Sequence, residues 1–130
     1  MTNLPTQEAI RQELTEIDSY LNSHCSEDIN ECAQRGNDLA VYIARTGRLL
    51  ADCKFYRDSA IELATIECME KCPSNAPSIQ KRFIESKTKE ENYLVNWCDR
   101  LNRTATHQLQ FMVTLISKAK EEMKYLNTNR

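Results

Sequence analysis

The chain has 130 residues, enough for one domain with a core, but only two glycines and three prolines. So few turn-forming residues exclude all-β and α/β folds, which need a turn about every ten residues. They predict one all-α domain over residues 1–130. With 41% hydrophobic and 28% charged residues, the chain is neither disordered nor embedded in a membrane, and no apolar run approaches the roughly 20 residues that span a bilayer.

The net charge of −2 is unevenly distributed. Residues 1–34 carry seven acidic residues against Arg11, which gives −6, so residues 35–130 carry +4. This surplus is well below the concentrated positive charge that is typical of nucleic-acid-binding proteins.

The first predicted helix covers residues 6–23. Its apolar residues follow Pro5 at the spacing i, i+4, i+7, i+11, which indicates one buried helix face. They are Ile10, Leu14, Ile17 and Leu21.

The second predicted helix covers residues 27–71, because Ser26 suits an N-cap, acidic residues follow it, and no proline occurs before Pro73. A turn at residues 72–77 lies within the PSNAPS region, and the third predicted helix covers residues 77–125. Each long helix is about 70 Å in length. A short link predicts that they pack as an antiparallel hairpin.

Apolar residues of the third predicted helix recur about every 3.6 residues from Leu94 to Met123, which is the period of a straight helix. Trp97 and Phe111 widen this apolar stripe. One hairpin with one short helix has too little surface to cover it, so we expect a helical bundle that forms a homo-oligomer, a dimer or larger.

Small residues form a row along the second predicted helix. Glycine weakens a helix, so two glycines in one row suggest that another helix packs closely there. We call these residues the small-residue row: Ala33, Gly36, Ala40, Ala44, Gly47 and Ala51.

The six cysteines predict core thiols rather than a metal site. Cys68 and Cys72 share a helix face, but a structural zinc site needs four ligands, and Cys25 and Cys32 lie about 60 Å away along a continuous helix. Five cysteines fall on or beside apolar stripes and are better explained as small buried residues: Cys32, Cys53, Cys68, Cys72 and Cys98. The turn near residue 75 also brings Cys53 close to Cys98.

The stretch DRLNRTATHQLQF, residues 99–111, is the best candidate for a binding surface. Arg103 and His107 lie on the polar face of this helix, where solvation is the first explanation. In an antiparallel hairpin, however, four arginines lie in one band that suits phosphate or an acidic protein. This arginine band consists of Arg45, Arg48, Arg100 and Arg103, with His107 beside it and Asp52 and Asp99 near enough to neutralise part of it.

No pattern indicates catalysis or a cofactor. The chain has no glycine-rich phosphate loop, no nucleophile motif and no Glu-x-x-His pair of a di-iron bundle. We therefore expect a protein that is not an enzyme.

The segment ENYLVNWCDRLNRTATHQLQFMVTLISKAKEEM, Glu91 to Met123, resembles the closing helix of small uncharacterised helical proteins from phage and prophage DNA-metabolism or recombination regions. The resemblance implies a non-enzymatic accessory protein that works beside single-strand-binding or recombination proteins.

Three functions follow from the sequence. The leading hypothesis is an interaction or scaffold protein with a protein partner in DNA metabolism. The alternatives are weak direct DNA binding through the arginine band and a cysteine-based metal-binding protein. The N-terminus has no basic and apolar segments of a secretory signal, so we expect a cytoplasmic protein with free cysteines.

Overall fold

The computed structural model describes residues 3–128, which form four helices and no strand. These are α1 (Gln7–Leu21), α2 (Ile29–Lys71), α3 (Pro77–Lys87) and α4 (Lys89–Thr128). The predicted all-α fold is confirmed. None of the described helices combines the length and the apolar character that crossing a membrane requires.

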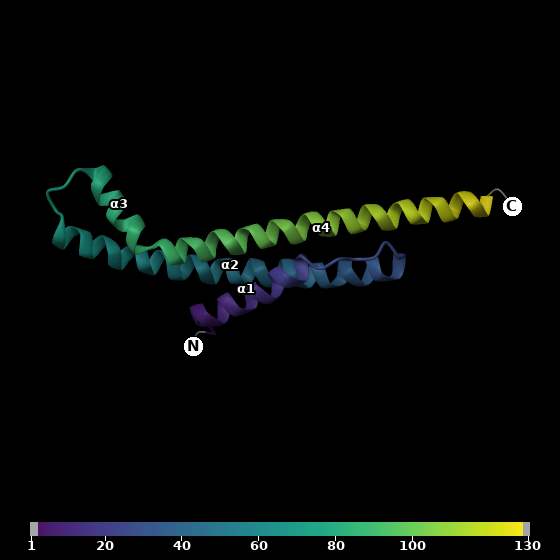
Figure 1. Cartoon of the computed structure of the whole chain (residues 1–130), viewed down its shortest axis with the longest axis horizontal. Helices are drawn as coiled ribbons and strands as arrows, with labels where there is room; N and C mark the ends of the chain where they lie inside the picture. Colours follow the sequence, from purple (N-terminus) through teal and green to yellow (C-terminus); the bar gives the residue numbers. More distant parts are fainter. Residues whose placement is uncertain (1–2, 129–130) are drawn as a thin grey trace.

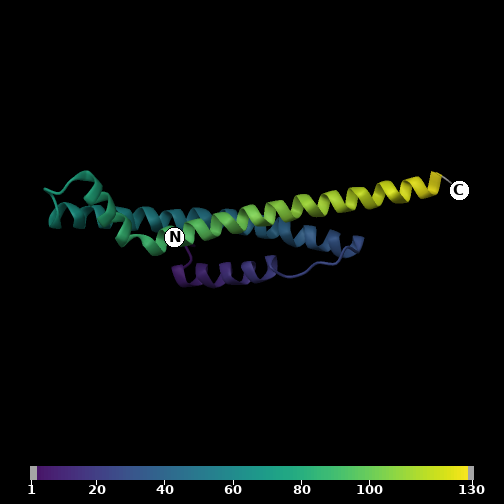
Figure 2. The same cartoon turned by 45° about the horizontal axis from the view of Figure 1, so that its top comes forward.

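The helices form an elongated molecule. α2 and α4 run side by side in opposite directions, and α1 lies against both of them (Figures 1 and 2). α3 folds back at the end of α2, and α4 extends past the other end of α2 (Figure 1).

The first helix forms as its sequence predicts. The side chain of Thr6 accepts a hydrogen bond from the amide of Ala9, which caps the helix N-terminus. All four residues of the predicted apolar face are buried, so α1 contributes a complete stripe to the core.

The start of α2 differs from the prediction, because Asp28 rather than Ser26 is the N-cap. The Asp28 carboxylate accepts from the amide of Glu31 at 3.2 Å. Ser26 instead accepts from the amide of Asp28 at 3.0 Å. The helix therefore begins two residues later than expected, at Ile29.

The predicted third helix is wrong in one respect, because the chain breaks at Thr88 into α3 and α4. Thr88 has φ −118° and ψ 18°, and its hydroxyl donates to the carbonyl of Ile84 at 2.9 Å. This hydroxyl also accepts from the Asn92 side chain at 3.2 Å. Such local side-chain bonds compete with helix continuation, and no proline or glycine marks the position.

The core lies where α1, α2 and α4 meet. Its largest fully buried side chains include Leu39 and Leu49 of α2 and Leu94 of α4. A polar pair crosses this core: the amide of Asn102 donates to the hydroxyl of Thr46 at 2.8 Å. Thr46 itself has no exposed surface.

The apolar stripe of α4 continues beyond its helical neighbour. It is buried or partly buried as far as Met112, remains partly exposed at Ile116 and Ala119, and is 58% exposed at Met123. α2 begins at Ile29, and beyond that point no described helix lies beside α4 (Figures 1 and 2). We call residues 113–128 the α4 extension.

Candidate functional site

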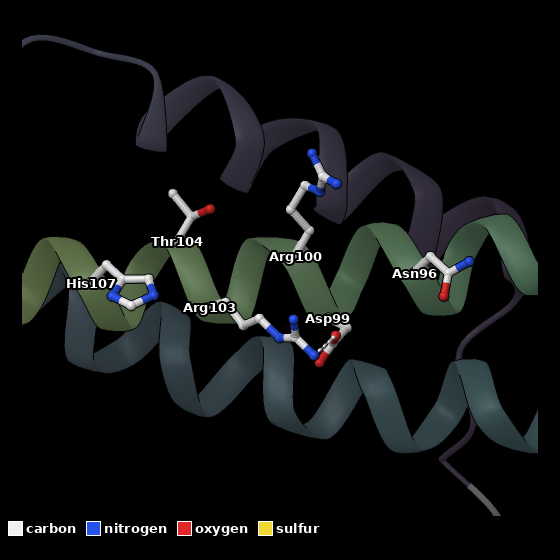
Figure 3. A pocket seen from close by; sticks show the side chains of 6 residues that line it. All are labelled: Asn96, Asp99, Arg100, Arg103, Thr104 and His107. Atoms are coloured by element: carbon white, nitrogen blue, oxygen red, sulfur yellow. Dashed lines mark ion pairs between the residues drawn. The ribbon is translucent and has the colours of Figure 1, made fainter.

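The polar face of α4 carries a shallow surface depression, shown in Figure 3. Arg100 extends toward α1, whereas Arg103 turns toward Asp99 on the other side of the helix (Figure 3). Three of the predicted contact residues therefore line one depression. Its lining consists of Asn96, Asp99, Arg100, Arg103, Thr104 and His107.

Carboxylates neutralise part of this surface, as predicted. A guanidinium nitrogen of Arg103 lies 2.9 Å from Asp99 on the same helix face. On α2, Arg48 lies 4.0 Å from Asp52. Both ion pairs are i, i+4 pairs at the surface, where each contributes only about 0.3 to 0.5 kcal/mol. Arg100 forms no ion pair with any described residue.

Arg45 has a different role from the one its place in the arginine band suggested. Its guanidinium binds both carboxylate oxygens of Glu13 on α1, at 2.6 and 2.7 Å. This bidentate hydrogen bond raises the pKa of Arg45. Neither Arg45 nor Arg48 lines the depression on α4, so the four arginines do not form one lining.

A buried arginine that the sequence reasoning missed joins three helices. Arg35 is 8% exposed and donates to Gln108 of α4 at 2.8 Å and to Ser23 at 2.9 Å. Its guanidinium also lies 4.4 Å from the centre of the Tyr20 ring. The spacing of Arg35 could have predicted its burial, since Arg35 falls between Cys32 and Leu39 on the buried face of α2.

Tyr20 is the other polar residue of this junction. Its hydroxyl donates to a carboxylate oxygen of Asp38 on α2 at 3.0 Å. Burial and this hydrogen bond raise the pKa of Tyr20 to about 12. Tyr20 therefore connects the C-terminal end of α1 to α2 both through its hydrogen bond to Asp38 and through its ring contact with Arg35.

Four cysteines are core residues, as predicted: Cys32, Cys53, Cys68 and Cys98. The predicted proximity of Cys53 and Cys98 is confirmed, because the neighbouring Cys53 and burial both raise the pKa of Cys98. The thiol of Cys98 itself donates to the carbonyl of Thr46 at 3.2 Å. Cys25 and Cys72 are only partly buried. Cys72 lies outside the predicted buried stripe because it caps α2 rather than continuing it. No group of three or more metal-binding side chains occurs among residues 3–128.

The small-residue row does not form a close contact within the chain. A Cβ added at Gly36 would lie 3.6 Å from Leu109 of α4, but one added at Gly47 would meet no atom within 4 Å. The four alanines of the row are exposed. The buried face of α2 runs through Leu39 and Thr46, one residue earlier, and one residue rotates a helix by about 100°.

Most of the large exposed apolar side chains belong to two groups. One group lies where α2 meets α3 and comprises Leu63, Ile66, Met69 and Ile79. The other lies along the C-terminal half of α4 and comprises Phe111, Val113, Met123, Tyr125 and Leu126.

Comparison of the chain with protein families, with curated proteins and with solved structures gave no significant match.

Proposed function

We propose that this protein is a non-enzymatic interaction or scaffold protein that associates with a second copy of itself through the α4 extension. The carrying observation is that the apolar stripe of α4 continues past the point where α2 begins. A helix with an apolar stripe and no neighbour leaves that stripe in water, which favours association.

The spacing of this stripe suits pairing between helices. In the α4 extension, Ile116, Ala119, Met123 and Leu126 are separated by three, four and three residues, and only Ile116 of these still packs against the core. This is the spacing of the a and d positions of a heptad, whose side chains interlock between two helices. Ala119 at its centre allows the helix axes to approach closely.

The charges beside the stripe also permit two copies to meet. The α4 extension carries three lysines, Lys118, Lys120 and Lys124, and two glutamates, Glu121 and Glu122. Because both signs occur within one short segment, two copies can align lysine with glutamate and avoid strong repulsion.

The proposal includes a cellular setting. The resemblance of residues 91–123 to phage and prophage proteins supports an accessory role beside DNA-metabolism proteins. The six free cysteines support a reducing compartment such as the cytoplasm.

Light scattering coupled to size-exclusion chromatography tests the association. The wild-type chain should be a dimer or larger at micromolar concentration, and Met123→Glu should shift it toward the monomer by placing charge on the stripe. Leu63→Glu is the matched control, since Leu63 is similarly exposed, at 70% against 58%, but lies on α2. A wild-type monomer at every concentration, or a dimer that Met123→Glu leaves intact, would refute the proposal.

A second candidate function is direct DNA binding by the depression on α4. The observation in its favour is Arg100, which is exposed and has no carboxylate partner among the described residues. The third candidate is metal binding through Cys68 and Cys72, whose thiols are adjacent. Binding of a labelled oligonucleotide and elemental analysis, respectively, distinguish these candidates from the scaffold.

A further inference from the structure

Two thiols meet at the corner where α2 ends and α3 folds back. The sulfur atoms of Cys68 and Cys72 lie 3.3 Å apart. Cys68 is 2% exposed, whereas Cys72 is partly exposed. The pair therefore combines one buried sulfur with one that solvent can reach.

The backbone at Cys72 permits this close approach. In a regular helix the Cβ atoms of residues i and i+4 are about 5 to 6 Å apart, whereas a disulfide needs about 3.5 to 4.5 Å. Cys72 has left helical geometry, with φ −140° and ψ 51°, although its amide still donates to the carbonyl of Cys68 at 2.8 Å. Rotation about φ changes the direction of its Cβ relative to the helix.

Gln80 of α3 holds the corner in place. Its side-chain amide donates to the carbonyl of Cys72 at 3.2 Å, and its own carbonyl lies 3.9 Å from the sulfur of Cys68. The thiol of Cys68 and the backbone of Cys72 are therefore held against α3, so the pair does not lie on a free helix end.

We propose that Cys68 and Cys72 form a redox-active dithiol that a low-molecular-weight disulfide, such as oxidised glutathione, converts into an intramolecular disulfide. The thiolate of Cys72 attacks one glutathione sulfur, which breaks the glutathione disulfide and releases one reduced glutathione. The thiolate of Cys68 then attacks the sulfur of Cys72 and releases the second. The two cysteines are oxidised, and their two protons end on the two glutathione molecules.

The other cysteine pairs lack this combination of contact and access. Cys53 and Cys98 are neighbours, but both are at most 1% exposed in the core between α2 and α4, and the thiol of Cys98 donates to the carbonyl of Thr46. Cys25 and Cys32 both donate to the carbonyl of Ser26, at 3.3 and 3.4 Å. Their thiols are directed to the backbone, and Cys32 has no exposed surface.

The sequence makes the product simple to detect. Trypsin cleaves after Arg57, Lys71 and Lys81, so Cys68 lies in the peptide 58–71 and Cys72 lies in the peptide 72–81. Each peptide contains one cysteine. A disulfide between Cys68 and Cys72 therefore links two peptides that separate when it is reduced.

The test incubates the native full-length chain with a series of oxidised and reduced glutathione mixtures, followed by acid quenching, alkylation in denaturant and tryptic mass spectrometry. The linked peptide pair should be the first disulfide to form as the mixture becomes more oxidising. Cys68→Ser should instead retain one glutathione on Cys72, because no second thiol can displace it. Cys72→Ser should give neither the link nor an adduct.

Cys25→Ser serves as the control and should leave the formation of the link unchanged, since Cys25 lies in the segment before α2, at the opposite end of that helix from Cys68 and Cys72. Circular dichroism of each variant reports whether it is folded. Oxidation of another cysteine pair before this one, or Cys68→Ser without an adduct on Cys72, would overturn the proposal.

Discussion

Asn102 of α4 donates a hydrogen bond of 2.8 Å to the buried hydroxyl of Thr46 on α2. The same amide group donates to the carbonyl of Ile43 at 3.1 Å. The hydroxyl of Thr46 in turn donates to the backbone carbonyl of Tyr42 at 2.8 Å. Sliding α4 along α2 would break these bonds inside the core. This polar pair therefore specifies the alignment of two helices whose apolar contacts alone tolerate several positions.

Asn102→Ala should lower the free energy of unfolding by about 1 to 3 kcal/mol, because it removes two hydrogen bonds in a partly buried site. Thr46→Val should cost less, since Asn102 keeps its bond to Ile43. Urea unfolding of both single variants and the double variant, at one protein concentration, measures the coupling between them. Strict additivity of the two effects would show that the bond does not contribute.

Much of the fold was predictable because it depends on local periodicity. The stripe of α1 and the ends of α2 follow from apolar spacing and from caps near the expected residues. The break at Thr88 was not predictable from the sequence. It involves a side-chain hydrogen bond that any threonine in a helix can make, and most threonines that make this bond do not end the helix. Thr88 is also buried, at 1% exposed, and α3 packs against α2, and such tertiary contacts are not visible in local periodicity.

The candidate site was predictable only in part, for a related reason. The residues of α4 share a helix face, so Arg100, Arg103 and His107 were correctly grouped. Arg45 was assigned to the same surface, but α1 supplies Glu13 to it. The periodicity of α1 and that of the hairpin each identify a buried face. Neither shows at which position along the hairpin α1 packs.

The raised pKa of Tyr20 predicts that the free energy of unfolding falls at high pH. Its pKa is raised to about 12 in the folded chain, compared with about 10 in the unfolded chain. Between these values the unfolded state loses the proton more readily, so the free energy of unfolding falls as the pH rises from about 10 to about 12. Tyr20→Phe should remove this part of the pH dependence, and Tyr93→Phe should not. Equal pH profiles for wild type and Tyr20→Phe would contradict the assignment.

Two substitutions of Gly47 distinguish an effect on folding from an effect on association. Open space surrounds the position of its missing Cβ, so Gly47→Ala should raise the free energy of unfolding by up to about 1 kcal/mol through helix propensity. If another copy of the chain packs on the small-residue row, Gly47→Leu should weaken association by about 1 to 3 kcal/mol through overpacking, without lowering the stability of the monomer. Sedimentation equilibrium measures the association constant. An unchanged constant would place Gly47 on open surface in the assembly as well.

The cysteines predict a protein whose fold does not depend on zinc. Three of the six thiols, those of Cys32, Cys53 and Cys98, are distributed along the buried faces of α2 and α4. The two adjacent thiols at the corner of α2 and α3 are fewer than the four ligands of a structural zinc site. Elemental analysis should find no stoichiometric zinc, and the melting temperature should be unchanged by a chelator. One zinc per protomer, or unfolding in the chelator, would favour the metal-binding alternative.

The depression on α4 predicts weak binding to DNA. Arg103 is paired with Asp99 and Arg45 with Glu13, so Arg100 is the one arginine of the arginine band with no carboxylate partner among the described residues. The net charge of −2 adds long-range repulsion. We therefore expect a dissociation constant of about 10 μM or weaker at physiological salt, which is within the range of non-specific binding.

Fluorescence anisotropy with labelled single- and double-stranded oligonucleotides at two salt concentrations checks this prediction, with Arg100→Ala/Arg103→Ala as the test variant. Lys118→Ala/Lys120→Ala is the matched control, because it removes the same charge from the α4 extension outside the depression. If the arginines contacted phosphates, their removal would reduce the salt dependence by about two counterions. Submicromolar binding that the arginine variant loses and the lysine variant keeps would make DNA binding, and not scaffolding, the function of this helix face.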